Sequence, residues 1–128
     1  MFNETINTNI PTVLVRGDTK DIRVVFTSDG LNVTPNGMLP DDTLSFSICK
    51  KGSSQAAFTV TTTVSDGLFK ITHENTKDLK PGKYEYDIEF RKEDMSVVKT
   101  LQLGEIEVKK DITIWWLSMS KRQILNSS

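Results

Sequence analysis

The sequence predicts an all-β sandwich that folds as one domain. Short segments alternate apolar with polar residues, which is typical of half-buried strands. Turn-forming residues separate these segments at spacings of about ten residues, the pattern of a sandwich or barrel. A chain of 128 residues fits a single domain with a sizeable core. We therefore expect seven or eight strands in an antiparallel arrangement and little helix.

The expected strands follow one another between residues 12 and 111. They occupy residues 13–15, 22–26, 44–49, 57–64, 68–71, 84–90, 97–103 and 106–108, with Gly104 interrupting the last pair. Asp66-Gly67 predicts a hairpin between two of these segments. Residues 28–42 are rich in Gly, Pro and Asn and predict a long connection, and residues 73–79 are long enough for one helical turn.

The two ends of the chain differ from this alternating region. Residues 1–11 are polar, rich in Asn and Thr, and end at Pro11, so we expect an arm outside the core. Residues 12–111 are expected to form the sandwich, and residues 112–128 a tail.

Composition argues against several classes of partner. The formal net charge is −1, from 16 basic and 17 acidic residues, and no basic stripe is present to bind nucleic acid. No apolar run approaches the length of a membrane span, and the first residues lack the pattern of a secretory signal, so cytoplasmic synthesis is expected. Cys49 is the single cysteine, which excludes an internal disulfide and a zinc site built from paired cysteines.

The residues do not form a recognisable catalytic set. His73 is the single histidine and lies in a polar segment, where we expect a solvated loop residue, and Cys49 has only Lys50 beside it as an activating cation. Carboxylates alternate on two segments and would form an acidic patch if these are neighbours, partly neutralised by nearby cations: Glu85, Asp87 and Glu89, then Glu105 and Glu107, with Lys83, Arg91 and Lys99. A solvated sheet face is the preferred interpretation. We expect no enzyme activity, cofactor, metal site or small-molecule substrate.

The segment from Leu79 to Tyr86 resembles the tyrosine corner of immunoglobulin-like sandwiches. In that device a Tyr follows a tight corner, here Pro81-Gly82, and its hydroxyl bonds to backbone a few residues upstream. Tyr84 would be the corner residue, and Leu79 would close the end of the core. The alternative is an ordinary Tyr in an alternating strand. Tyr86 stands where antibody domains have a cysteine, so no inter-sheet disulfide is implied.

The order of segments from Gly17 to Asp111 resembles small structural proteins of tailed bacteriophages. It is similar to the immunoglobulin-like N-terminal domains of baseplate upper proteins. The resemblance rests on Gly17-Asp18-Thr19 before an alternating strand, on the strand that begins at Asp42, on residues 79–88 and on the final segment 98–108. It implies a virion part that holds fibres or receptor-binding proteins to a baseplate, fibre base or capsid, made in the host cytoplasm. Its partners would be other virion proteins or copies of itself.

The tail concentrates apolar residues at the end of the chain. It contains both tryptophans, and its candidate interface residues are Trp115, Trp116, Leu117, Met119, Ile124 and Leu125. Adjacent residues of a strand face opposite ways, so both tryptophans cannot pack on one surface if the segment is extended. Packing on a partner is preferred over packing on the chain's own core, because aromatic residues are enriched at interface centres. The alternative function, a carbohydrate-binding or adhesion module, would need Trp115 and Trp116 as an exposed platform.

Overall fold

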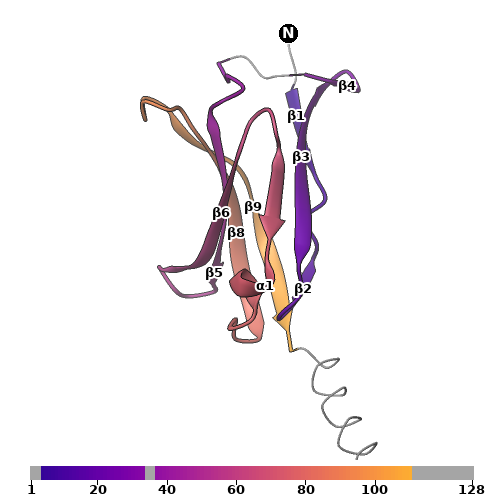
Figure 1. The fold of residues 1–128 in the computed structure, drawn as a ribbon, viewed down its shortest axis with the longest axis vertical. Helices are drawn as coiled ribbons and strands as arrows, with labels where there is room; N and C mark the ends of the chain where they lie inside the picture. Colours follow the sequence, from indigo (N-terminus) through magenta and orange to yellow (C-terminus); the bar gives the residue numbers. More distant parts are fainter. Residues whose placement is uncertain (1–3, 34–36, 111–128) are drawn as a thin grey trace, which may run out of the picture.

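The computed structural model describes residues 4–33 and 37–110 and shows two packed β-sheets (Figure 1). The predicted all-β sandwich is confirmed. The described residues form nine strands and one helical turn. In chain order they are β1 (Glu4–Thr8), β2 (Val13–Val15), β3 (Lys20–Ser28), β4 (Leu31–Asn32), β5 (Thr43–Lys50), β6 (Ala56–Thr63), β7 (Leu68–Ile71), α1 (His73–Thr76), β8 (Gly82–Arg91) and β9 (Val98–Lys109).

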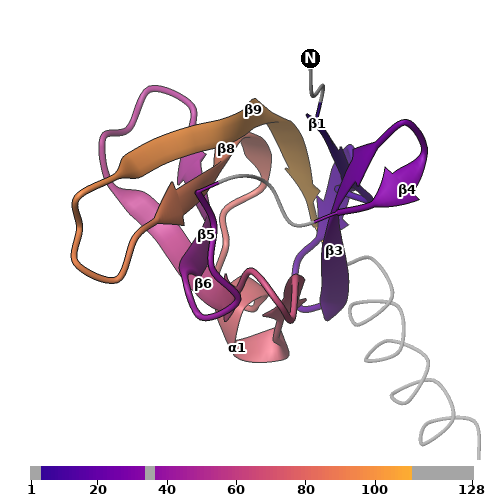
Figure 2. The same cartoon turned by 90° about the horizontal axis from the view of Figure 1, so that it is seen from above.

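One sheet has five strands in the order β2-β9-β8-β5-β6, and the other joins β1, β4 and β7 to β3. Seen from above, the two sheets face each other with α1 near the lower side (Figure 2). The adjacent strands β9, β8 and β5, and the set β1, β3 and β7, match the two sheets of an immunoglobulin-type sandwich. The β2–β9 pair is parallel, which departs from the expected antiparallel arrangement, because the chain crosses at Pro11 from one sheet to the edge of the other.

The core lies between the sheets and is centred on Phe46, which is fully buried. Its ring lies 5.8 Å from that of Phe69 on the opposite sheet and 5.7 Å from that of Tyr86 on its own sheet. The alternating apolar residues predicted from the sequence supply this core, including Ile22, Val24 and Phe26 on β3 and Tyr84, Tyr86, Ile88 and Phe90 on β8.

The prediction that residues 1–11 form an arm outside the core is partly wrong. Residues Glu4–Thr8 form β1, which pairs with β3 so that Ile6 lies opposite Phe26. Ile6 and Ile10 pack against the core. The Asn9 side chain accepts a hydrogen bond from the Arg23 amide at 2.7 Å. Ile6 and Ile10 are in phase with a strand, but only polar residues lie between them, so the sequence alone gives a weak strand signal here.

The prediction of a hairpin at Asp66-Gly67 is also wrong, because this turn carries the chain from one sheet to the other. Strand β6 pairs with β5, whereas β7 pairs with β3. The Val24 amide donates to the Gly67 carbonyl at 2.7 Å, which holds the turn against β3. Gly67 has a φ of 62°, and a Cβ there would lie 2.7 Å from the Val24 carbonyl oxygen. The turn therefore needs glycine for both conformation and space.

Gly104 does not interrupt the last strand, since β9 runs through it as one element. Gly104 lies opposite Tyr86, and a Cβ there would lie 2.6 Å from the Tyr86 hydroxyl oxygen. The Tyr86 ring occupies the space that a side chain at residue 104 would fill. Its hydroxyl accepts a hydrogen bond from the side-chain amide of Gln102 at 2.8 Å. This fusion, together with the unpredicted β1 and β4, changes the expected seven or eight strands to nine in the described residues.

The single helical turn appears where the sequence predicts it. Thr72 and Asn75 form a capping box that begins α1. None of the helical residues that the structure describes form a segment with the length and hydropathy of a membrane span.

Candidate functional site: an open sheet edge between charged ends

The predicted corner has the geometry of a tyrosine corner. The Tyr84 hydroxyl donates a hydrogen bond of 2.7 Å to the Lys80 carbonyl, four residues upstream. Tyr84 and Leu79 are buried, and Gly82 takes a φ of 144° just after Pro81. Burial raises the pKa of the Tyr84 hydroxyl. The corner fixes the start of β8 and has a structural role.

The predicted interface residues of the tail lie outside the described part of the chain. Trp115, Trp116, Leu117, Met119, Ile124 and Leu125 all fall within residues 111–128. The tail therefore stays a prediction.

The carboxylates of β8 and β9 share the outer face of the five-stranded sheet, as expected for neighbouring strands. Glu85 lies directly opposite Glu105. Three cations pair with this face: Lys51 lies 3.3 Å from Glu105, Lys109 lies 3.9 Å from Glu107, and Arg91 contacts Glu89. Of the three cations expected to neutralise the patch, Arg91 is the one with an ion pair among the described residues. Burial, followed by repulsion from Glu89, raises the pKa of Asp87.

His73 and Cys49 both make local contacts with backbone. The Nδ1 of the exposed His73 lies 2.7 Å from the Gly17 carbonyl, so the ring ties α1 to the connection before β3. The Cys49 thiol donates to the Ser53 and Gln55 carbonyls at the end of β5. Neither side chain contacts a second reactive group within the described residues. Both contacts hold loops in place.

The feature that most resembles a docking site is the outer edge of β6. Strand β6 is the last strand of its sheet, and no described strand pairs with its outer side. Its sequence, AAFTVTTT, has no charged residue and no proline. Ile48 pairs with Phe58 and Cys49 with Ala56, so Ala57 is an extra residue and residues 58–63 form the regular part. Edge strands of this length are usually protected by lysine, proline or a covering element.

The two faces of β6 differ in a regular way. Phe58 and Val60 turn inward and pack against the core, and the Phe58 ring lies 6.4 Å from that of Phe46. Thr59 and Thr61 are exposed on the outer face, and the Thr59 hydroxyl lies 2.9 Å from that of Ser47 on β5. The edge is therefore held in extended form by β5 and packs against the core through its inner face.

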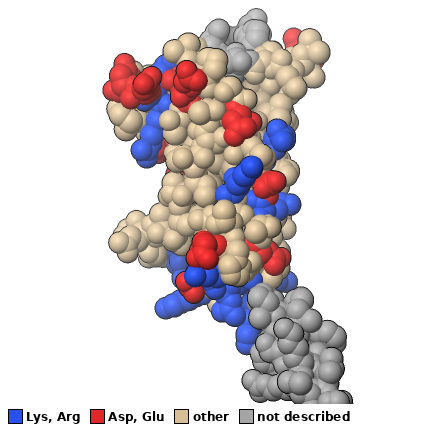
Figure 3. Space-filling model, viewed as in Figure 1, with Lys and Arg blue, Asp and Glu red and all other residues tan. Residues whose placement is uncertain are grey.

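The two ends of β6 lie at oppositely charged ends of the molecule. Acidic side chains outnumber basic ones at the upper end, in residues 29–33, 37–42, 64–67 and 92–97 and the strand ends beside them: Asp29, Asp41, Asp42, Asp66, Glu93 and Asp94, against Arg91, Lys92 and Lys99. Basic side chains dominate residues 16–20, 50–55, 72–83 and 109–110 at the lower end: Arg16, Lys20, Lys50, Lys51, Lys77, Lys80, Lys83, Lys109 and Lys110, against Asp18, Glu74 and Asp78. Figure 3 shows mainly red atoms at the upper left, with some blue atoms beside them, and mainly blue atoms at the lower end.

Asp42 fixes the acidic end beside β6. Its carboxylate accepts a hydrogen bond from the Leu39 amide at 2.8 Å and lies 3.0 Å from the Lys92 ammonium. Its carbonyl accepts from the Val64 amide, which joins the connection before β5 to the end of β6. The Leu39 amide, assisted by Lys92, lowers the pKa of the buried Asp42. Asp42 is therefore a structural anchor rather than a free ligand.

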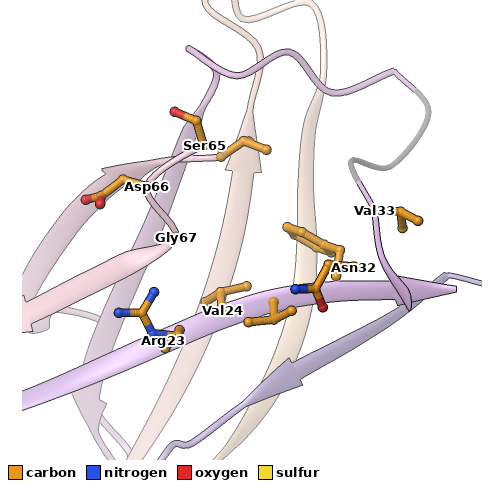
Figure 4. Close-up of a pocket in the computed structure, with 10 residues that line it drawn as sticks. Arg23, Val24, Asn32, Val33, Ser65, Asp66 and Gly67 are labelled. Carbon is orange, nitrogen blue, oxygen red and sulfur yellow. The ribbon is translucent and has the colours of Figure 1, made fainter. Parts of the chain in front are cut away.

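A shallow pocket of about 330 Å³ lies between β3, β4 and the turn after β6. Figure 4 shows Arg23 from β3 and Asp66 from the turn on the same side of it. Asp66 also accepts a hydrogen bond from the Thr62 hydroxyl at 2.9 Å, so its carboxylate braces the end of β6. The pocket thus contains both signs of charge and no selective set of ligand groups.

Comparisons of the sequence with known protein families and with curated proteins find no match. Among residues 4–33 and 37–110, no three side chains of His, Cys, Asp or Glu gather closely enough to hold a metal ion. The edge of β6 and the charged ends that flank it form the candidate docking surface of the described residues.

Proposed function

We propose that this chain is a non-enzymatic structural protein of a tailed-bacteriophage virion, a docking or adaptor domain in a baseplate, fibre-base or capsid-associated assembly. The observation that carries the docking role is the uncharged outer edge of β6. The resemblance of residues 17–111 to baseplate upper proteins supplies the virion context.

A strand edge docks a partner through main-chain hydrogen bonds, while side chains that alternate on the two faces select the partner. The β6 edge has the features that this mode needs. Its backbone is held in extended form by β5, and Phe58 and Val60 connect it to the core. Because β6 carries no charge, an incoming strand loses no ionic hydration there. The partner would be another virion protein or another copy of this chain.

The tail adds a second predicted contact to this proposal. Two adjacent tryptophans followed by Leu117 and Met119 have the composition of an interface centre. Deleting residues 112–128 should leave a folded, soluble protein that no longer joins its assembly. If the shortened chain instead aggregates or loses cooperative unfolding, the tail belongs to its own core, and docking must rely on the edge alone.

The test is to locate the protein in purified phage particles. Particles from a lysate are banded on a density gradient, and the ratio of this chain to other virion proteins is measured by quantitative mass spectrometry. A fixed ratio in every particle fraction is expected for a structural part. Recovery of the chain only in the soluble fraction would contradict the proposal. Specific binding to a glycan array by the purified chain would favour the carbohydrate-binding alternative.

A further inference from the structure

We infer that the β6 edge pairs with β6 of a second copy, antiparallel and across a two-fold axis at Val60. This inference rests on the proposed docking function and names its partner. The two five-stranded sheets would join into one sheet of ten strands. Three features of the described residues support it: the composition of the edge, its side-chain alternation and the charges at its two ends.

The composition of β6 allows it to pair with itself. In a two-fold pair each residue meets a residue of the same strand, so any charge on the strand would be repeated on the facing copy. Strand β6 has none, and its exposed residues Thr59 and Thr61 are β-branched residues whose hydroxyls can bond across strands. Self-pairing therefore meets no like-charge repulsion.

The alternation of β6 selects the register. Residues directly opposite in an antiparallel pair point to the same face, so the apolar faces stay aligned only if a residue, not a peptide bond, lies on the axis. An axis at Val60 keeps all pairs within the regular residues 58–62 and away from the extra residue Ala57. In this register Thr59 of each copy faces Thr61 of the other. Phe58 faces Thr62, and Val60 faces Val60.

The charges at the ends favour the antiparallel direction. Strand β6 begins beside Lys50 and Lys51 at the basic end and finishes beside Asp66 at the acidic end. Antiparallel pairing places the basic end of each copy beside the acidic end of the other. Each dimer therefore contains two contacts between a basic and an acidic end, whereas parallel pairing would bring like charges together.

The first experiment uses opposite charges at the two facing positions in the full-length protein. A Lys variant carries T59K and T61K, and a Glu variant carries T59E and T61E. Each variant alone should be monomeric by light scattering at concentrations where the unchanged protein is dimeric, because like charges then face each other. An equal mixture should form a one-to-one heterodimer. A monomeric unchanged protein, or a mixture that stays monomeric, would overturn the inference.

The second experiment tests the register by disulfide trapping in a C49S background. Thr59→Cys and Thr61→Cys lie on the same face of the same strand, so each alone is the matched control for the mixture. Mixed under mild oxidation, they should cross-link at least about tenfold faster than either alone, because pairing brings the facing thiols to a high effective concentration. Faster cross-linking of either variant with itself would overturn the register.

The two proposals fail in different ways. If the charge and cysteine variants give no sign of self-pairing but T59K/T61K still prevents incorporation into particles, the copy-to-copy inference is wrong and docking at β6 stands with another partner. If the same variant is incorporated normally and self-pairing is present, the edge serves the dimer alone, and the proposed docking function at β6 is wrong.

Discussion

The two edges of the five-stranded sheet differ in the features that control strand addition. Strand β2 has three residues, Val13–Val15, and is followed by Arg16, whereas β6 has eight residues without charge. The chain reaches β2 directly from β1 in the other sheet, so this edge is short and flanked by its own chain. Natural proteins commonly protect edges with short strands and charged residues. The contrast predicts that β6 accepts an added strand more readily than β2 does.

The openness of β6 follows from the turn after it. A hairpin at Asp66-Gly67 would have covered its outer edge with β7. The turn instead passes β7 to the opposite sheet, where it pairs with β3. With β7 in the opposite sheet, the eight residues of β6 have no outer neighbour among the described strands.

The largest effect is expected for Gly67→Ala, which tests the turn that keeps β6 open. The new Cβ meets the Val24 carbonyl, and the backbone has a positive φ. We expect the free energy of unfolding to fall by about 2–4 kcal/mol, measured by urea denaturation. Gly52→Ala, at a φ of 90° with open space around it, is the control for conformation alone and should lose less. Equal losses would show that contact with β3 does not define the turn.

A smaller effect is expected for Tyr84→Phe, which separates folding from edge function. Removing the hydroxyl of the buried Tyr84 breaks its hydrogen bond to the Lys80 carbonyl, and this should lower the free energy of unfolding by about 1 kcal/mol. Self-association at β6 should not change, because Tyr84 lies inside the core. An unchanged melting temperature would show that the Tyr84 hydroxyl does not stabilise the fold.

Alternation predicts most of the strands, because apolar residues facing the core leave a period of two in β3, β5 and β8. The corner is also predictable, since Leu79, Pro81, Gly82 and Tyr84 are close in sequence and form one local device. Two other features cannot be predicted locally, because contacts between residues far apart in sequence decide them. The turn at Asp66-Gly67 crosses between the sheets, and the Tyr86 ring packs over Gly104. The open edge is unpredictable for the same reason: the β6 sequence predicts a strand but does not show which neighbour it lacks.

The acidic end beside β6 should show a pH-dependent stability that Asp42→Asn removes. The lowered pKa of Asp42 means that its charged form is favoured by folding. Its contribution is therefore fully present above the ordinary value near 3.8 and is lost as pH falls through the lower folded value. Asp42→Asn should lower the melting temperature at pH 7, less than Tyr84→Phe does. The difference from the unchanged protein should shrink below pH 4; a constant difference would contradict the ionic role.

The smallest effects on stability are expected for lysine at the two edges. Thr61→Lys on β6 and Val13→Lys on β2 both change surface positions, so each should shift the free energy of unfolding by about 0.5 kcal/mol or less. Their effects on self-association should differ. Thr61→Lys should raise the dissociation constant of the dimer, measured by sedimentation, whereas Val13→Lys should leave it unchanged. Equal effects would remove the distinction between the edges.

Backbone hydrogen exchange at two protein concentrations tests the open edge most directly. The outward-pointing amides of β6 have no partner in a single copy, so they should exchange rapidly in dilute solution. We expect their protection to rise with concentration as copies pair, while the β2 amides exchange at the same rate throughout. Rates in β6 that are independent of protein concentration would contradict pairing at this edge.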